Sequence, residues 1–364
     1  MRPTWRDDAP VASDSPLTRY RQRLWRRTLV GLAMGAALLV LTLVSLASGT
    51  YRLSVEALLA ILFAGPGGEG IETQIIWGIR LPRVAAALLA GAALALAGTL
   101  LQGLLRNPLA SPFTLGIAQG AALGATCAIV FFGAGQLHST GAQAVTLNAP
   151  LGVVSLALLG GLSSAALILL IATLRGLTPE AVVLAGIALG AFASAATMIV
   201  QYFASDTQAA ATLFWTFGDL GRAGWPEVAW LAGALVVFGV LPWRAAWHYN
   251  AMAWGDDPAR ALGVDVVRHR LLGTAAAATL AAIATAFLGI IGFIGLIAPH
   301  AVRLLIGSDQ RFLLPFSALA GALILLAADT LGRLLLAPVV LPVGAVTALV
   351  GAPLLLVLLL RGRP

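Results

Sequence analysis

The residues that could carry out chemistry are few in this chain, and their spacing does not form a catalytic constellation. Asp329 and Arg333 are four residues apart, which on a helix places them one turn apart, where they can pair with each other. The single cysteine, Cys127, lies in an apolar run, so neither a disulfide framework nor a cysteine-ligated metal cluster is expected. The four histidines are scattered over predicted loops and helix ends: His138, His248, His269 and His300. We therefore expect no catalytic residue and no metal site in this chain.

Lysine is absent, and all 22 basic residues are arginine. A P-loop needs a lysine for the β- and γ-phosphates, so the chain cannot be a self-sufficient P-loop ATPase. The glycine-rich AGPGGEG at residues 64–70 is therefore predicted to be an ordinary loop. The apolar segments also contain almost none of the ionisable side chains that ion-coupled carriers use. The energy for any uphill transport must therefore come from another polypeptide, which indicates an ATP-driven complex, and no cofactor is expected in this chain.

Long apolar segments must position these few polar groups. The chain has 364 residues, of which 60% are hydrophobic and only 10% charged, whereas soluble domains carry roughly 25% charged residues. A spanning helix needs about 20 mostly apolar residues, and residues 54–64 are too short, so they are predicted to form an interfacial helix capped by Ser54. We predict an all-α polytopic membrane protein, with a basic tail at residues 1–27 and a single transmembrane domain at residues 28–361. Its ten spans are predicted at residues 28–48, 81–105, 112–133, 151–174, 180–203, 226–247, 269–289, 292–306, 312–334 and 343–361.

The arginines are distributed unevenly between the two sides of these spans. With the N-terminus inside, the interior segments hold 17 of the 22 arginines, seven of them in the tail, which is predicted to be disordered. This is the positive-inside asymmetry, so both termini are predicted to be cytoplasmic. It also explains the net charge of +7 without a nucleic-acid partner.

Cutting the chain after the fifth span gives two halves, at about 28–205 and 226–361. Because each half contains an odd number of spans, the halves must have opposite orientations, as in the inverted repeats of many transporters. Each half contains an apolar helix followed by a proline-containing polar turn, RNPLASP in the first and GLIAPHAVR in the second. In the first turn, prolines 108 and 112 stop a continuous helix, and Asn107 can satisfy free backbone groups.

Small residues form a row in the fifth span, where Gly186, Gly190 and Ser194 fall on one helix face. Such rows let helix backbones approach closely in lipid. Two interpretations remain open: ordinary packing within the chain, or a face at a subunit interface or along a transport pathway.

Residues 80–124, RLPRVAAALLAGAALALAGTLLQGLLRNPLASPFTLGIAQGAALG, closely resemble the FecCD-type, BtuC-like permeases. These are membrane subunits of bacterial ABC importers for iron–siderophore complexes, haem and vitamin B12. The other matching blocks are WTFGDLGRAGW (215–225), WGDDPARALGV (254–264), GFIGLIAPHAVRLLIGSDQR (292–311) and LPVGAVTALVGAPLLLVLL (341–359). The resemblance implies the type II importer fold with ten helices, an inner-membrane homodimer, two cytoplasmic ABC ATPase subunits and a periplasmic binding protein.

The resemblance also implies a docking site, because Arg80, Arg83 and Arg333 match positions that face acidic residues of the binding protein. The sequence gives independent support for two of them. Pro82 is predicted to begin a helix there, and the dipole at a helix N-terminus disfavours cations. Such a placement favours an anionic partner, although contact with lipid phosphates is an alternative.

Residues 248–268 match the cytoplasmic coupling segment of the family. Asp257 can cap a short helix, Pro258 fits its first position and Gly263 can end it. A short rigid helix could act as a lever for an ATPase, although a plain connector is the alternative. The residues expected to take part in coupling are Asp256, Asp257, Pro258, Ala259, Arg260, Leu262, Gly263, Arg106, Asn107, His300 and Arg303.

Spans five and ten match the helices that line the family's transport pathway. The residues expected at the pathway and its cytoplasmic gate are Thr178, Pro179, Glu180, Gly186, Gly190 and Ser194. We expect a non-enzymatic permease for a bulky metal chelate, with an iron(III)–siderophore first and haem or cobalamin as alternatives. A membrane-embedded lipid-modifying enzyme is a remote alternative, because it would need convergent polar residues within the bilayer.

Overall fold

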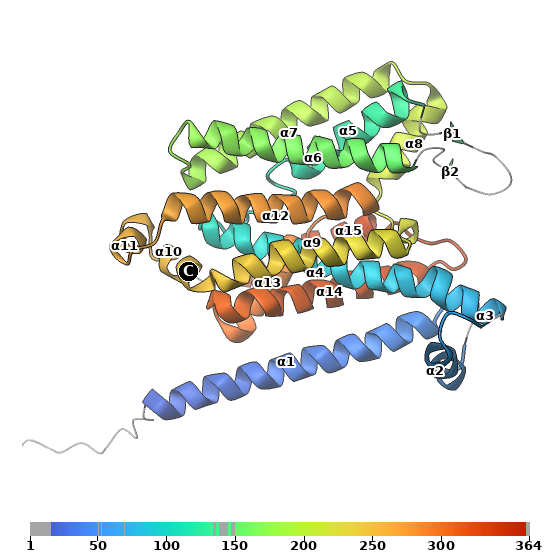
Figure 1. The fold of residues 1–364 in the computed structure, drawn as a ribbon, viewed down its shortest axis with the longest axis horizontal. Coiled ribbons are helices and arrows are strands. Elements are labelled where there is room, and N and C mark those ends of the chain that lie inside the picture. Colours follow the sequence, from blue (N-terminus) through green and yellow to red (C-terminus); the bar gives the residue numbers. More distant parts are fainter. Residues whose placement is uncertain are drawn as a thin grey trace, which may run out of the picture.

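The computed structural model describes residues 16–49, 51, 53–68, 70–133, 136–137, 145–146 and 150–361 (Figure 1). Apart from a small antiparallel hairpin of β1 (Gln136–Leu137) and β2 (Val145–Thr146), these residues are helical or in loops. The helices up to residue 216 are α1 (Pro16–Ala47), α2 (Val55–Ala64), α3 (Ile71–Gln74), the π-helix η1 (Ile75–Arg80), α4 (Leu81–Leu104), α5 (Ile117–Phe131), α6 (Pro150–Thr173), α7 (Pro179–Tyr202) and α8 (Asp206–Thr216). The later ones are the 3₁₀ turn η2 (Leu220–Arg222), α9 (Trp225–Arg244), α10 (Ala246–Met252), α11 (Asp256–Ala261), α12 (Val266–Leu288), α13 (Ile294–Ile306), α14 (Gln310–Leu334) and α15 (Val343–Arg361).

The ten-span prediction agrees with these helices. Seven segments are long and apolar enough to cross a membrane, and they contain α1, α4, α6, α7, α9, α12 and α14. The shorter apolar helices α5, α13 and α15 correspond to the three remaining predicted spans. The short helix predicted at residues 54–64 is present as α2, and the Ser54 side chain accepts a hydrogen bond from the Ala57 amide at its start; its location at the membrane interface stays a prediction. The helix α8 was not predicted.

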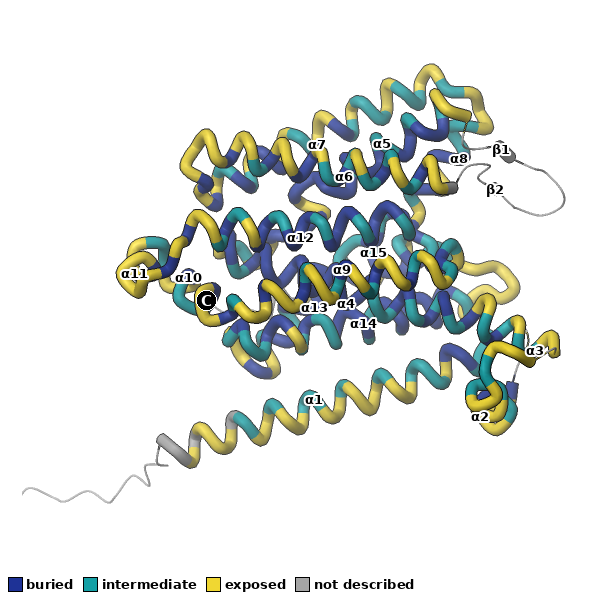
Figure 2. Tube along the Cα trace, viewed as in Figure 1, coloured by how far each residue is buried: buried dark blue, intermediate teal, exposed yellow. Residues whose placement is uncertain are grey.

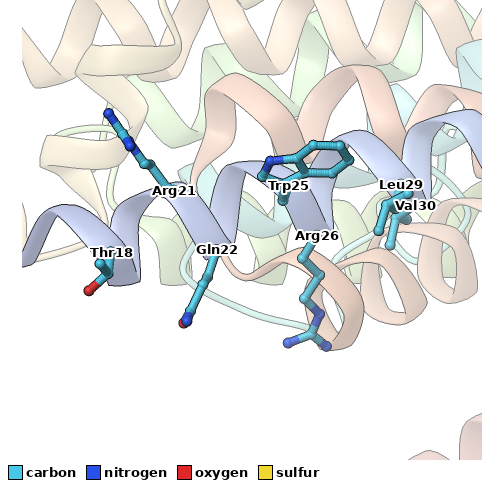
Figure 3. A pocket seen from close by; sticks show the side chains of 7 residues that line it. All are labelled: Thr18, Arg21, Gln22, Trp25, Arg26, Leu29 and Val30. Carbon is cyan, nitrogen blue, oxygen red and sulfur yellow. The ribbon is translucent and has the colours of Figure 1, made fainter. Parts of the chain in front are cut away.

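The first helix begins earlier than predicted, so the interpretation of residues 16–27 as a disordered tail is wrong. Arg27 ties this extension to the rest of the protein: it donates to the Ile306 carbonyl at 3.4 Å and lies 4.1 Å from the centre of the Phe312 ring. Farther toward the helix start, Arg21, Trp25 and Arg26 project from α1 (Figure 3). The shallow pocket there is lined by α1 residues alone, so it is a surface hollow. Residues 1–15 lie outside the described part of the chain.

Helix α4 lies at the centre of the bundle, and most of its residues are buried, whereas α1 is largely exposed (Figure 2). Close backbone contacts explain why its sequence is rich in small residues. A β-carbon on Gly98 would lie 1.9 Å from the Gly295 carbonyl oxygen of α13, and one on Gly91 would lie 2.3 Å from the Gly321 oxygen of α14. Because no side chain fits at these crossings, glycine permits the packing of α4 against its neighbours.

The two halves share a local feature that fits the predicted inverted repeat. The third helix of each half, α5 or α13, is short and follows a bend in which the N-cap residue is left-handed. These residues are Gly116, with φ of 76°, and Phe293, with φ of 66°. The first helices of the halves, α1 and α9, run in opposite directions (Figure 1).

The loops divide between two ends of the bundle. At one end, called the α11 end here, lie α10, α11, the beginning of α1 and the end of α15 (Figure 1). At the opposite end, called the α3 end, lie α2, α3, α8 and the β-hairpin (Figure 1). Most candidate functional residues fall into one group at each end, whereas Gly186, Gly190 and Ser194 lie along the middle of α7.

Candidate docking, coupling and pathway sites

The short helix α11 is the centre of the predicted coupling segment, and the structure confirms that residues 248–268 contain such a helix. Gly255, with φ of +120°, is its N-cap, so the prediction that Asp257 caps the helix is wrong. Pro258 is the third helical residue and not the first, because α11 begins at Asp256. Gly263, with φ of +81°, follows the helix and allows the chain to turn away, as predicted.

One face of α11 is anchored and the other is open. Ala259 is completely buried, whereas the side chain of Asp257 is 93% exposed and Leu262 is 72% exposed. Pro258 and Arg260 are also exposed, and the Arg260 guanidinium donates to the Asp257 carboxylate at 3.1 Å. The helix therefore presents a mixed apolar and charged surface outward.

The anchored side of α11 carries an ion-pair network around Asp256. Its carboxylate accepts hydrogen bonds of 2.8 and 3.1 Å from the guanidinium of Arg270, at the start of α12. Arg106, in the turn after α4, lies 3.2 Å from the same carboxylate. The hydrogen bonds from Arg270 lower the pKa of Asp256 against the opposing effect of burial, and the charges of Arg270, Arg106 and Arg260 lower it further.

Arg270 connects this network to two other segments. Its guanidinium also donates to the Leu177 carbonyl at 3.0 Å and, through Nε, to the Leu104 carbonyl at 3.3 Å. One buried side chain thus joins α11, the end of α4 and the residue before the cap of α7. Our sequence reasoning missed Arg270, although an arginine inside a predicted span is a costly placement that could have drawn attention to it.

The predicted gate residues surround the start of α7. Thr178 is the N-cap and accepts a hydrogen bond from the Ala181 amide, and Pro179 is the first helical residue. Glu180 is exposed in the first turn, where the helix dipole favours an acidic side chain. Leu177 brings this segment into contact with Arg270.

The row of small residues on α7 favours the simpler of its two interpretations. A β-carbon on Gly190 would lie 3.0 Å from the Gly116 α-carbon, and one on Gly186 would lie 3.0 Å from the Leu115 α-carbon. Both glycines therefore serve packing against the loop before α5 within this chain. Ser194 is half-buried on the same helix.

The remaining predicted coupling residues, Asn107, Arg303 and His300, have contacts within the chain or are partly buried. The Asn107 side chain accepts a hydrogen bond from the Leu109 amide at 2.9 Å, as expected for a turn that closes on itself. Arg303 donates to the buried Gln102 of α4 at 3.0 Å, so its guanidinium ties α13 to α4. His300 is half-buried on α13.

A second ion-pair network lies at the α3 end and contains two of the predicted docking arginines. Asp329, whose side chain is 1% exposed, receives hydrogen bonds from Arg83 at 2.8 Å and from Arg333 at 3.1 Å. The predicted pairing of Asp329 with Arg333 is confirmed. Arg333 also donates to the Ser45 hydroxyl of α1 at 2.6 Å, so the network joins α1, α4 and α14.

The third docking arginine, Arg80, is also engaged within the chain. It is buried, and its guanidinium donates to the backbone carbonyls of Leu46, Ala47 and Tyr51. The placement of Arg80 and Arg83 at a helix N-terminus is wrong, because the apolar helical segment runs without a break from Ile71 to Leu104. The helix dipole therefore gives no support for an anionic partner at Arg80 and Arg83, and the docking role of these arginines stays a prediction.

These sites contain no arrangement that could perform a covalent reaction. Within the described residues, no group of three His, Cys, Asp or Glu side chains could hold a metal ion. In the part of the chain that the structure describes, the long apolar helices, an ion-paired network at each end and an exposed short helix fit a polytopic membrane protein.

The chain belongs to the FecCD transport family, whose model matches residues 37–361. A relative from Methanocaldococcus jannaschii, named "Putative ABC transporter permease protein MJ0087", is 46% identical over 94% of this chain and 97% of its own length. The Fe(3+)-citrate import system permease protein YfmE of Bacillus subtilis is 38% identical over 92% of this chain and 95% of its own. The vitamin B12 import system permease protein BtuC of Salmonella arizonae is 37% identical over 96% and 99%.

A solved structure agrees with this assignment. It is described as "An inward-facing conformation of a putative metal-chelate type ABC transporter", with a TM-score of 0.78 and 30% identity over 92% of this chain and all of the other. The protein described here is therefore a multi-pass membrane permease subunit of an ABC transport system and not an enzyme.

Proposed function

We propose that this permease imports a bulky metal chelate, first of all an iron(III)–siderophore, by alternating access driven by a separate ABC ATPase. The observation that carries the proposal is α11, an exposed short helix whose anchored face is joined through Asp256 and Arg270 to the start of α7. A helix held in this way can receive a push from a partner and pass it to a spanning helix. The chain itself has no lysine for a P-loop, so the nucleotide belongs to the partner.

The α11 end is assigned to the cytoplasm, together with both termini. The arginine asymmetry supports this orientation, because the tail and the loops at this end contain most of the basic residues. The permease would form a homodimer in the inner membrane. Two ATPase subunits would then contact the exposed residues of α11, and these subunits would bind ATP and Mg²⁺.

The proposed movement passes through a small number of contacts. ATP binding closes the ATPase subunits and displaces α11, and Asp256 carries Arg270 with it. Because Arg270 also holds the Leu177 carbonyl, the N-terminus of α7 follows, with Thr178, Pro179 and Glu180. The same displacement reaches α4 through the Leu104 carbonyl.

Docking of a periplasmic binding protein is assigned to the α3 end. Arg83 and Arg333 already share Asp329, so acidic residues of a docked protein would have to compete with this carboxylate. Docking would thus weaken the ion pair between α4 and α14. This change would allow the two helices to move relative to each other. Arg80 would act by fixing the end of α1 and the loop after it, because its guanidinium donates to the carbonyls of Leu46, Ala47 and Tyr51.

The choice of substrate rests on the relatives. Their names include a ferric-citrate permease, a vitamin B12 permease and, in Yersinia pestis, the hemin transport system permease protein HmuU at 37% identity. Haem or cobalamin is accordingly the second candidate. No observation favours a lipid-modifying enzyme, because the buried carboxylate on the described spanning helices, Asp329, is already paired with Arg83 and Arg333.

Reconstitution in proteoliposomes tests the proposal. The permease, its ATPase and its binding protein are assayed for Mg-ATP-dependent uptake of a ferric siderophore, haem and cobalamin, with an ATPase variant that cannot hydrolyse ATP as the control. We expect accumulation of the ferric siderophore only with the active ATPase. Uptake of haem or cobalamin alone would overturn the substrate assignment, and accumulation by the permease without any ATPase would overturn the mechanism.

A further inference from the structure

A groove of about 550 Å³ lies at the α11 end between α9, α10 and α12, and no residue of α7, α11 or α15 lines it. Its walls are apolar along most of their length. The residues that form these walls are Phe238, Leu241, Leu272, Ala275 and Ala276. Such a groove between spanning helices is open to the acyl chains of the surrounding lipid.

The end of the groove next to α10 is polar and cationic. It is lined by Arg268, His248 and His269, and the two imidazole rings stack with their centres 4.3 Å apart. Arg268 is exposed, and no hydrogen-bond or ion-pair partner of its guanidinium is found in the described part of the chain. The His269 ring is held by the Asp265 carbonyl, 2.8 Å from Nδ1. An uncompensated arginine beside two imidazoles is a fitting site for a phosphate group.

The dimensions of the groove match one leaflet of a bilayer. It follows α12 from Arg268 to Thr279, which at 1.5 Å per residue is about 16 Å. The hydrocarbon core of a bilayer is about 30 Å thick, so the groove is about as long as a single layer of acyl chains.

Tryptophans place the polar end of the groove at the level of the lipid headgroups. Trp243 donates its indole N–H to the Arg311 carbonyl at 3.0 Å, and the Arg311 guanidinium lies 3.9 Å from the centre of the Trp247 ring. Both indoles are exposed, and exposed tryptophans collect at the boundary between membrane and water. Basic pockets between spanning helices at this level recognise anionic headgroups.

We propose that this groove binds one anionic phospholipid, with its phosphate at Arg268 and His248 and an acyl chain along Leu241, Leu272 and Ala276. Charge complementarity identifies the lipid class, because a zwitterionic headgroup would bring its own cation to the unpaired arginine. The bound lipid lies against α10 and the start of α12, and it therefore braces the two elements that flank the coupling helix.

Native mass spectrometry of the full-length permease tests this inference, with phosphatidylglycerol or phosphatidylcholine added to the delipidated protein. We expect one phosphatidylglycerol per chain to survive at activation energies that remove phosphatidylcholine. One arginine near a membrane surface contributes about 1 kcal/mol to the binding of an anionic lipid, so Arg268→Ala should weaken phosphatidylglycerol binding about fivefold. Leu272→Trp, at an exposed wall residue, should fill the groove and reduce binding without disturbing the core.

Arg244→Ala is the matched control, because Arg244 is exposed at the end of α9 and does not line the groove. It removes the same charge at a neighbouring position and should leave the bound lipid in place. Equal weakening by Arg244→Ala and Arg268→Ala, or equal retention of both lipids, would overturn the proposal. Displacement of the lipid by glycerol phosphate alone would also overturn it, since the site would then recognise a free phosphate. Reduced binding in Leu272→Trp with an unchanged melting temperature would support the groove directly.

Discussion

The carboxylates of Asp329 and Asp256 are each held between two arginines, and they differ in what surrounds them. Asp329, at the α3 end, lies within the long helix α14, and its arginines Arg83 and Arg333 belong to α4 and α14. Asp256, at the α11 end, begins a six-residue helix, and its side chain is 22% exposed. The same chemistry therefore joins spanning helices to one another in one place, and a short exposed helix to the bundle in the other.

The difference shows that ion pairs between aspartate and arginine can either hold spanning helices rigidly together or transmit the movement of a short helix to the bundle. Removing one member of a buried ion pair leaves the other charge without compensation and costs about 3–5 kcal/mol, whereas exposed pairs contribute about 0–1 kcal/mol. Asp329 belongs to the first class. Around Asp256, Arg270 is buried and Arg106 is partly exposed, so this network combines a firm contact with a weak one.

The largest effect is expected for Asp329→Ala. The variant leaves two arginines facing each other in a buried site, so the free energy of unfolding should fall by about 3–5 kcal/mol. Chemical unfolding in detergent measures this loss. Asp329→Asn keeps a hydrogen-bond acceptor and should recover part of the stability. A loss below about 1 kcal/mol would show that the network at the α3 end is no more rigid than a surface pair.

Asp256→Ala should have the second-largest effect, and mainly on coupling. The buried Arg270 keeps its two carbonyl acceptors, so the stability loss should be about 1–3 kcal/mol. Because α11 is then no longer tied to Leu177, the amount of ATP hydrolysed per chelate transported should rise several-fold in proteoliposomes. Asp257→Ala is the matched control, since Asp257 is the next residue and is almost fully exposed. An unchanged ratio of ATP hydrolysed to chelate transported in Asp256→Ala would show that the Asp256 network does not take part in coupling.

Arg106→Ala should have a smaller effect, because its side chain is 39% exposed and Asp256 retains Arg270. We expect a loss of no more than about 1 kcal/mol that disappears at high salt, where exposed pairs are screened. Thermal unfolding at low and high ionic strength measures this difference. A salt-independent loss would place Arg106 with the buried pairs.

The smallest effect is expected for Arg260→Ala, which removes an exposed pair on α11 itself. Pairs of this kind stabilise a helix by about 0.2–0.5 kcal/mol, so the melting temperature should hardly change. A reduced affinity of the variant for the ATPase, measured in detergent with the purified subunits, would show that the outward face of α11 is the contact surface. An unchanged affinity for the ATPase would show that Arg260 on the outward face of α11 does not contribute to the contact.

The sequence was sufficient for the spans, because apolar segments of about 20 residues are a local property. It was also sufficient for the Asp329–Arg333 pair, whose members are one helical turn apart. It could not reveal Arg83 as the third member, because Arg83 and Asp329 are 246 residues apart in the chain. Arg270 was missed for the same reason, since its partners come from three separate segments.

Two helix boundaries were also predicted wrongly from local sequence patterns, those of α4 and α5. Pro82 looked like a helix start, yet prolines are also tolerated where a helix continues from a π-helical turn, as it does here through Ile75–Arg80. The predicted third span began too early, because residues 111–116 form a turn held by Ser111 and Thr114 before α5 begins at Ile117. In both cases the backbone geometry of a few neighbouring residues determines the boundary, and the position of a proline alone does not reveal that geometry.

The unbroken helical segment from Ile71 to Leu104 is longer than the membrane it crosses. Its 34 residues measure about 51 Å along the axis, and even a tilt of 40°, at the upper end of the usual range, would leave about 39 Å measured across a hydrocarbon layer of about 30 Å. At least two helical turns must therefore stand in the headgroup layer or in water. At the α3 end this segment lies beside α2, because the Trp77 indole donates to the Ile61 carbonyl at 3.3 Å. The excess length therefore gives that end of the bundle a rigid helical projection outside the hydrocarbon layer.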